Sequence, residues 1–235
     1  MKEQHYILMA DIIGSGSQNG GDLMKDFKEL VEKVNRENNN KLLSPLTITL
    51  GDEFQGVATS LEDAINLIIA LEEEIIDLKK AFKLRYVLYH GVIDTPINSE
   101  VAYGMLGEGL TQARALLESL KKDRKRRFHV HLMTNEYLMS LLNLTFLNYQ
   151  SIVDDWRMKD WDMVKSFLNL KDYKKVAEVL GKDNSSVFRR KDSLEILEYF
   201  SCRGVLRLLS SNASNIQASF VPERDEILEE VAELL

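Results

Sequence analysis

The first 135 residues alternate between short apolar runs of strand character and longer stretches with helical periodicity. Residues 6–10 form a continuous apolar run, which is typical of a buried strand. Between residues 22 and 34, apolar side chains recur at every third or fourth position, which predicts an amphipathic helix. The same criteria predict strands at 46–50, 54–58, 84–92 and 128–132, a short partner strand after residue 92, and helices at about 61–79 and 107–121.

This order of elements predicts an α+β fold, in which a ferredoxin-like, mainly antiparallel sheet carries its helices on one face. After about residue 149 the pattern is helical without strands, so we place a domain boundary between residues 145 and 150. We expect an α+β domain at 1–145, a helical domain at 150–210, and a linker with an amphipathic C-terminal helix at 211–235. The apolar stripe of that last helix consists of Ile227, Leu228, Val231, Leu234 and Leu235.

Composition and charge exclude several classes of protein. The single cysteine, Cys202, excludes an internal disulfide framework and a metal site built on cysteines. The first apolar run is too short for a signal peptide or a membrane span, so we expect a cytoplasmic protein without membrane contacts. The net charge of −7 argues against a protein that coats nucleic acid, but residues 121–127 and 171–191 are locally basic. This asymmetry indicates a local phosphate-binding face on an acidic protein.

Two aspartates are candidates for a metal site. Asp11 ends the first strand, and Asp52 lies in a hairpin turn that the predicted topology places beside it. Two neighbouring carboxylates repel each other unless a cation or a shared proton lies between them, and hard divalent ions prefer oxygen ligands. We therefore expect Mg²⁺ or Mn²⁺ at Asp11 and Asp52. Gly14 and Ser15 follow in a loop of small residues, whose N–H groups can turn toward a phosphate.

Four motifs between about residues 5 and 135 together resemble the class III nucleotide cyclases. They are Asp-Ile-Ile-Gly-Ser after the first strand, Leu-Gly-Asp-Glu-Phe at the hairpin, His-Gly-Val at the end of a later strand, and Tyr-Gly-Met-Leu-Gly-Glu-Gly-Leu-Thr-Gln-Ala-Arg at a helix start. The hairpin also resembles the diguanylate cyclase signature. The resemblance implies a nucleotide-cyclase-type sheet, two metal ions at Asp11 and Asp52, and a nucleotide ligand. The residues expected at the nucleotide or its phosphates are Gly14, Ser15, Gly51, Glu53 and Arg114.

The departures from the cyclase pattern argue against turnover. Where these cyclases place an asparagine and an arginine that stabilise the transition state, this chain has Thr111 and Ala115. Arg114 is one position away, which is a rotation of about 100° on a helix. The base-selecting positions fall near Ile48 and at Gly104. Loss of such charge donors typically slows catalysis a hundredfold or more, so a nucleotide sensor is the preferred interpretation. A metal-dependent cyclase or other nucleotidyl-transfer enzyme, and an adaptor that binds no ligand, are the alternatives.

The second half contains a candidate helix-turn-helix. Ala177, Gly181 and Val187 have the spacing of a small packing residue, a turn glycine and a branched apolar residue of the second helix. Asp183 or Asn184 is a suitable N-cap for that helix. The segment resembles the helix-turn-helix of sigma-factor region four. The expected DNA-binding residues are Asn184, Ser185, Ser186, Arg189, Arg190 and Lys191.

The chain as a whole is most similar to the bacterial SatD family. Together, the two halves predict a DNA-binding regulatory protein whose degenerate cyclase-like domain binds a nucleotide. One helix-turn-helix makes few DNA contacts, so we expect a homodimer on two half-sites. Its expected partners are DNA and a nucleotide ligand.

Overall fold

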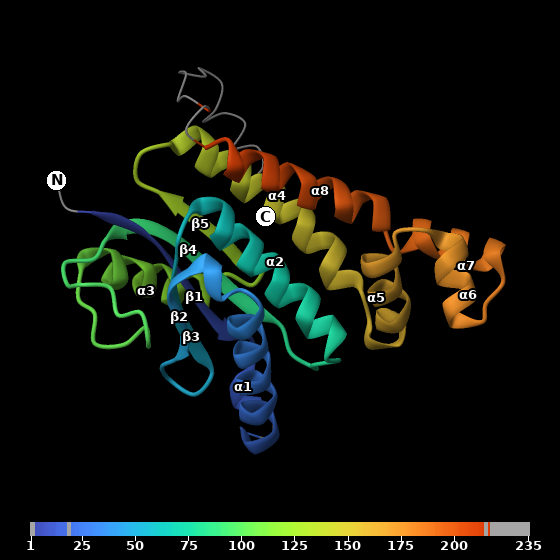
Figure 1. The fold of residues 1–235 in the computed structure, drawn as a ribbon, viewed down its shortest axis with the longest axis horizontal. Helices are drawn as coiled ribbons and strands as arrows, with labels where there is room; N and C mark the ends of the chain where they lie inside the picture. The colour runs from blue at the N-terminus through green and yellow to red at the C-terminus, as the bar shows by residue number, and fades with distance from the viewer. Residues whose placement is uncertain (1–2, 18–19, 214–215, 217–235) are drawn as a thin grey trace.

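The computed structural model describes residues 3–17, 20–213 and 216, and it has a mixed α+β fold (Figure 1). Five strands form one sheet in the order β2-β3-β1-β4-β5. The predicted α+β class is confirmed. The elements are β1 (Gln4–Ile12), η1 (Ser15–Ser17), α1 (Gly20–Glu37), η2 (Asn39–Lys41), β2 (Leu42–Ile48), β3 (Glu53–Ala58), α2 (Leu61–Asp77), β4 (Leu84–Val92), α3 (Glu108–Leu120), β5 (Phe128–Leu132), α4 (Glu136–Asp155), η3 (Met158–Asp160), α5 (Trp161–Leu170), α6 (Tyr173–Leu180), α7 (Asn184–Ser193) and α8 (Ile196–Ser211).

The central strand β1 pairs antiparallel with β3 and with β4, β2 pairs antiparallel with β3, and β5 runs parallel to β4. The sheet is therefore mainly antiparallel, as the order of elements predicts. The predicted short partner strand after residue 92 is wrong, because residues 93–107 form no strand. Pro96 cannot donate to a ladder, and the segment folds back on itself instead, with the N–H groups of Asp94 and Thr95 directed at the Leu106 carbonyl.

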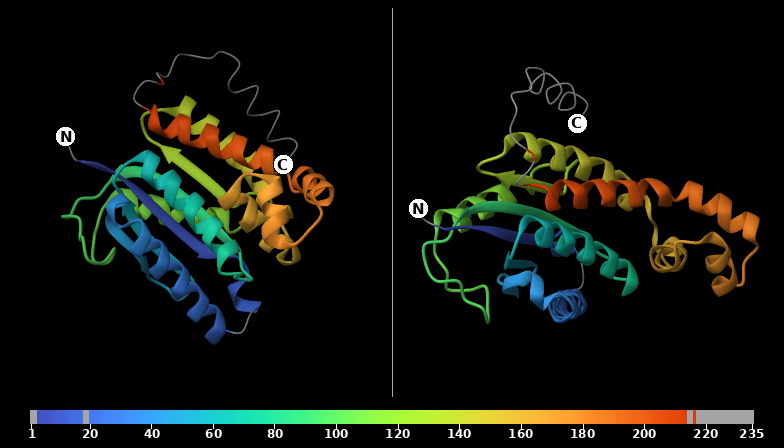
Figure 2. Two further views of the ribbon diagram at one scale, coloured as in Figure 1. Left: turned by 45° about the vertical axis from the view of Figure 1, so that its right-hand side comes forward. Right: turned by 45° about the horizontal axis from the view of Figure 1, so that its top comes forward.

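Helices cover both faces of the sheet, which corrects the prediction of helices on one face. Leu8, Ala10 and Ile12 of β1 pack into the large core under α1, α2, α4 and α8. Figure 2 shows α1 and α2 side by side over this face. Ile7 and Met9 point the other way, into a second core beneath α3. These side chains alternate because successive residues of a strand face opposite sides.

The backbone at the start of α3 packs directly against the backbone of β4. A Cβ atom added to Gly109 would lie 2.8 Å from the Val92 carbonyl oxygen and 2.9 Å from the Gly91 carbonyl carbon. Only glycine at this position allows the first turn of α3 to lie against β4. This contact fixes the start of α3, and with it the side chains that α3 presents above the sheet.

The C-terminal helices continue the core of the sheet. α4 is a single helix across the predicted boundary between residues 145 and 150, and α8 packs on both α4 and α2. The Tyr199 hydroxyl and the Arg203 guanidinium of α8 both donate to the Glu73 carboxylate of α2, each at 2.6 Å. Helices α5, α6 and α7 form a lobe at one end of the molecule (Figure 1). The division into domains stays a prediction.

Most of the predicted linker and C-terminal helix at 211–235 lies outside the described residues, so it also stays a prediction. Within the described part of the chain, no helix is both long enough and apolar enough to cross a membrane.

Candidate functional site

Three charged side chains form a row across the middle of the sheet. Asp11 of β1 lies directly opposite Glu53 of β3 and Arg85 of β4. Residues directly opposite each other in antiparallel strands point to the same face, and Asp11 shares the face of Ile7 and Met9, beneath α3. All three are buried, with relative exposures of 4 %, 6 % and 9 %. Buried charges of this kind require partners.

Each carboxylate in the row has a cationic partner. Nη1 of Arg85 donates to both oxygens of Asp11, at 3.0 and 2.8 Å. Nζ of Lys121, at the end of α3, donates to Oε1 of Glu53 at 2.6 Å. Burial raises the pKa of Asp11, and Arg85 and Lys121 oppose that rise. The row is therefore a buried ionic cluster under α3, in which Arg85 and Lys121 balance the charges of Asp11 and Glu53.

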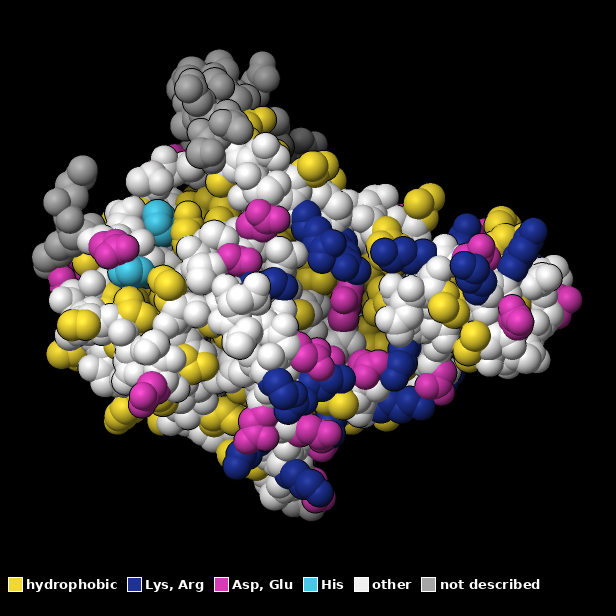
Figure 3. Space-filling view, in the orientation of Figure 1, with side chains coloured by type: hydrophobic (Ala, Val, Ile, Leu, Met, Phe, Trp, Pro, Cys, Tyr) yellow, Lys and Arg dark blue, Asp and Glu magenta, His cyan; other side chains and the backbone are white. Residues whose placement is uncertain are grey.

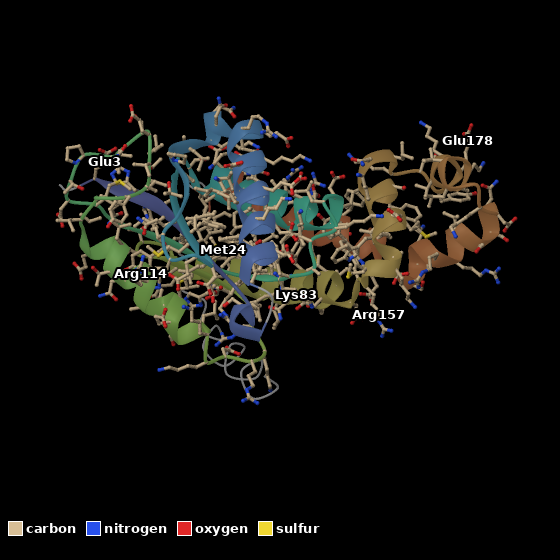
Figure 4. All side chains as sticks on the ribbon, turned by 90° about the horizontal axis from the view of Figure 1, so that it is seen from below. Glu3, Met24, Lys83, Arg114, Arg157 and Glu178 are labelled. Carbon is tan, nitrogen blue, oxygen red and sulfur yellow. The ribbon has the colours of Figure 1, made fainter. Side chains whose placement is uncertain are left out.

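Arg114 connects this cluster to solvent. Its Nη1 lies 3.8 Å from Oε2 of Glu53, and its side chain is 42 % exposed. The structure thus brings Arg114 to the predicted site although it lies one position away from the cyclase register. Figure 4 shows Arg114 on α3, at the end of the molecule opposite Glu178 of α6.

The predicted turn residues meet at the end of β1. The N–H of Ile12 donates to the Asp52 carbonyl at 2.9 Å, which places the β2–β3 turn beside Asp11 as predicted. The Asp52 carboxylate accepts a hydrogen bond from the Ser15 hydroxyl at 2.5 Å. Gly14 and Gly51 both adopt positive φ, 73° and 69°, which glycine tolerates without strain. Asp11 itself lies within β1 and not in the loop after it.

As arranged, these carboxylates do not fit a divalent ion. Both oxygens of Asp11 accept hydrogen bonds from the buried Arg85 guanidinium, and Asp52 is engaged with Ser15. A cation at Asp11 would have to displace Arg85. Among the residues that the structure describes, no three His, Cys, Asp or Glu side chains are grouped so that they could hold a metal ion.

A pocket of about 400 Å³ opens beside the charged row. Its walls come from the β2–β3 hairpin, the loop before α3 and the first turns of α3, and Met9 of β1 forms part of its lining. Much of the wall is apolar, and Arg114 supplies the charge. Thr49 lines the pocket, but its Oγ1 atom is itself buried and has no hydrogen-bond partner among the described residues. The other lining residues are Leu50, Gln55, Tyr103, Gly104, Met105, Leu106, Gly107, Leu110 and Thr111.

Arg85 was not predicted from the sequence as a site residue, and Lys121 was predicted only as part of a basic run. Thr49 and Gln55 were not predicted as site residues either, and Tyr103 appears in the prediction only as the first residue of a cyclase-like motif. Their nearness in sequence to predicted positions could have indicated them. Thr49 and Gln55 each lie three residues from Asp52, and Tyr103 lies next to Gly104. Two residues that the cyclase register singled out are exposed on α3: Thr111 lines the pocket, whereas Ala115 does not.

The segment of the candidate helix-turn-helix contains two short helices, α6 and α7. Gly181 ends α6 with a φ of 60°, and the Asp183 carboxylate caps α7 by accepting from the Ser186 N–H at 3.0 Å. Ala177 and Val187 are buried between the helices. Two capped helices do not by themselves show a helix-turn-helix domain, so both the motif and its function stay predictions.

The six predicted DNA-binding residues do not share one environment. Asn184, Ser185, Ser186 and Arg189 are exposed. Arg190 is instead turned toward η3, where its Nη2 pairs with Asp160 at 2.6 Å. Lys191 pairs with Asp192 at 3.3 Å and lies over the Phe188 ring. In Figure 3, Lys and Arg side chains are frequent around the lobe.

Several solved structures are similar to part of this chain. The adenylyl cyclase CyaB from P. aeruginosa is 14 % identical, with a TM-score of 0.39, over 51 % of this chain and 73 % of that one. A bacterial light-regulated adenylyl cyclase is 14 % identical, with a TM-score of 0.41, over 57 % of this chain and 47 % of that one. The guanylate cyclase domain of RhGC from Catenaria anguillulae, in complex with GTP, is 15 % identical, with a TM-score of 0.39, over 50 % and 74 %.

No curated protein matches the chain. The model of the SatD family matches residues 6–209, which is most of the sequence. The predicted membership is confirmed, and the chain belongs to the SatD family.

Proposed function

We propose that this SatD-family protein binds a small anionic ligand of the nucleotide class in the pocket between the β2–β3 hairpin and α3. The observation that carries the proposal is the position of Arg114. Its guanidinium lines an otherwise largely apolar pocket and lies 3.8 Å from the buried Glu53. A pocket with apolar walls and a few fixed polar groups is the usual form of a small-molecule site.

The lining residues divide by chemistry in a way that suits a nucleotide. Met105 and Leu110 offer apolar contact for a ring. Arg114 offers a planar donor group for a phosphate, with which guanidinium groups form charge-assisted and often bidentate hydrogen bonds. The predicted phosphate-binding residues Gly14, Ser15, Gly51 and Glu53 lie around the end of β1 and the adjoining hairpin, so we propose that the phosphates point that way.

The proposal is for binding without turnover. Neither Thr111 nor Ala115 can supply the positive charge that a transition state at this site would need. The proposal does not depend on the predicted Mg²⁺ or Mn²⁺, because an ion at Asp11 would have to displace Arg85. The enzyme alternative, a cyclase or other nucleotidyl transferase, predicts product and pyrophosphate on incubation with a nucleoside triphosphate and Mn²⁺. The adaptor alternative predicts neither product nor binding.

A thermal-shift screen tests the proposal. Nucleoside triphosphates and cyclic nucleotides are added to the full chain, each with and without Mg²⁺ or Mn²⁺, because a ligand that binds only the folded state raises the melting temperature. We expect at least one nucleotide to raise it, and Arg114→Ala to remove the rise. Gln112→Ala, at an exposed position on the same helix outside the pocket, serves as the control and should respond like the wild type. No shift with any nucleotide would contradict the proposal.

A second proposed function is DNA binding by α7. The observation that favours it is the exposure of Asn184, Ser185 and Arg189 along the first two turns of a capped helix, together with the burial of Val187 on its opposite side. In a helix-turn-helix the N-terminal residues of the second helix reach base edges in the major groove. The protein would then act as a DNA-binding regulator, as a homodimer on two half-sites, with the nucleotide as its signal.

Anisotropy titrations on duplex promoter fragments across a salt series test the DNA proposal. Arg189→Ala should weaken binding and reduce the salt dependence, because about 0.9 of the log–log slope is lost per phosphate contact. Arg190→Ala tests the stability of the lobe and not its contact with DNA. It removes the ion pair to Asp160, so we expect it to lower the stability of the lobe more than Arg189→Ala does. Equal affinity of the wild type and Arg189→Ala, or no binding at low salt, would contradict the proposal.

A further inference from the structure

The loop between α3 and β5, residues 121–127, is fixed at both ends; we call it the basic loop. At its start, Lys121 donates to Glu53 of the charged row. At its end, the buried Arg127 donates to both oxygens of Glu72 in α2, at 2.9 and 2.6 Å, and to Asp154 in α4 at 3.0 Å. A guanidinium held by two carboxylates in the core anchors the end of the loop firmly.

The middle of the basic loop is fixed as well. The Asp123 carboxylate accepts the backbone N–H groups of Lys125 and Arg126, at 2.8 and 3.1 Å, and also Nε of Arg126 at 2.7 Å. From α4, Nε2 of Gln150 donates to the Lys125 carbonyl at 2.7 Å. The loop therefore has a defined shape, and its outward side chains are presented from a rigid backbone.

Three of those outward side chains are cations without partners. Lys122, Arg124 and Lys125 are exposed, and no ion pair or hydrogen bond from their side chains to any described residue is present, whereas Arg126 is neutralised by Asp123. Like charges held close together repel each other. A loop that is tied down by core contacts while three neighbouring cations stay uncompensated favours an anionic partner with several charges.

The basic loop continues the proposed ligand pocket. Arg114 and Lys121 lie seven residues apart on α3, which is two turns or about 10 Å along the helix. Both contact Glu53. Lys121 is itself paired with Glu53 and Glu118, so the unpaired cations of the loop begin at Lys122, the next residue along the chain. A phosphate bound at Arg114 thus lies on the helix that leads into these cations. A mononucleotide seated in the pocket would leave the far cations unused.

From this arrangement we infer that the ligand of the pocket is the terminal nucleotide of a single-stranded nucleic acid, whose backbone follows the basic loop. This inference rests on the proposed function. The pocket rim supports a nucleic acid over another polyanion, because Tyr103 lines it and is 69 % exposed, and aromatic side chains stack on bases of any sequence. Apolar walls for one base and cations for successive phosphates are the two components of single-strand binding.

Fluorescence anisotropy with a labelled twelve-nucleotide single strand, across a salt series, tests the inference on the full chain. The variant Lys122→Ala/Arg124→Ala/Lys125→Ala removes the outward cations. Its control is Lys25→Ala/Lys28→Ala/Arg36→Ala, which removes three exposed cations from α1. We expect the loop variant to bind at least about tenfold more weakly at low salt, with a log–log slope smaller by up to about 2, because each single-strand phosphate contact contributes about 0.7. The control should bind like the wild type.

The same proteins are screened with the mononucleotide that gives the largest thermal shift. We expect the mononucleotide to raise the melting temperature of the loop variant as it does for the wild type, because Arg114 and the pocket are unchanged. If the wild type responds to the mononucleotide but does not bind the single strand, or if the loop variant binds the strand as well as the control, the inference is wrong and the proposed function stands. Binding of the strand that Arg189→Ala abolishes would assign it to α7 and would also overturn the inference. If no mononucleotide gives a shift, the proposed function itself fails.

Discussion

At the residue scale, the pairing of Asp11 with Arg85 dominates the charged row. Both residues are buried, with relative exposures of 4 % and 9 %. Arg85→Leu leaves the Asp11 carboxylate without its main partner, so we expect a loss of about 3–5 kcal/mol in the free energy of unfolding. The double variant Asp11→Leu/Arg85→Leu removes both charges and should lose clearly less. Urea unfolding of the two variants measures this, and equal losses would show that the pair is not the stabilising unit.

His129 provides a second prediction at this scale. Burial lowers its pKa to about 4, with Arg126 and His131 adding to the effect. Because the folded pKa lies below the unfolded value of about 6.5, the unfolded chain binds a proton that the folded chain does not. Stability from this group is therefore complete above pH 6.5 and is lost as the pH falls toward 4.

We expect His129→Gln to remove this part of the pH dependence, which amounts to about 3 kcal/mol at most. Urea unfolding of the wild type and the variant at several pH values between 4 and 7.5 checks it. Carboxylates also titrate in this window, so the difference between the two proteins is the measured quantity. Parallel stability curves for the two proteins would contradict the assignment to His129.

The sequence predicts part of the site at this scale. The meeting of the Asp52 turn with the end of β1 follows from hairpin topology and is confirmed by the hydrogen bond between Ile12 and Asp52. The position of Arg85 beside Asp11 could not be predicted, because it depends on the register of β1 against β4. A slip of one residue would turn Arg85 to the opposite face of the sheet.

At the scale of single elements, two glycines in the C-terminal helices predict opposite responses to the same change. Gly181 ends α6 at a φ of 60°, where a Cβ atom is strained, so Gly181→Ala should destabilise the protein by about 1 kcal/mol. Gly204 lies inside α8, and a Cβ atom there would meet nothing within 4 Å. Gly204→Ala should stabilise by about 0.5–1 kcal/mol. Chemical unfolding measures the free energy of unfolding of both variants. Changes of the same sign would contradict the strain expected at the Gly181 turn.

Helices and strands with clear periodicity are the elements that the sequence predicts well. The helix at 22–34 and the strands at 84–92 and 128–132 all form. The placement of α3 on the opposite face from the other helices could not be predicted, because it depends on the contact of Gly109 with β4. The strand predicted after residue 92 does not form, because the backbone of residues 93–107 makes hydrogen bonds within the loop instead of with the sheet.

At the scale of the whole molecule, one core runs from the sheet to α8. Apolar residues of β1, α2, α4 and α8 belong to the same buried cluster, and Glu73 of α2 holds Tyr199 and Arg203 of α8. We therefore expect thermal unfolding in a single transition, seen alike by circular dichroism and by the fluorescence of Trp156 and Trp161. A fragment of residues 1–145 should be unstable, because it would expose the apolar surface of α2. Two separated transitions would contradict this and would favour the predicted division into domains.

The central claim is that the pocket between the hairpin and α3 holds the anionic ligand. Hydrogen–deuterium exchange with and without the nucleotide that gives the largest thermal shift tests it most directly, because bound segments open less often. We expect slower exchange in peptides covering residues 49–55 and 101–114, and we expect Arg114→Ala to lose that protection. Protection confined to other segments, such as residues 184–193, would contradict the claim.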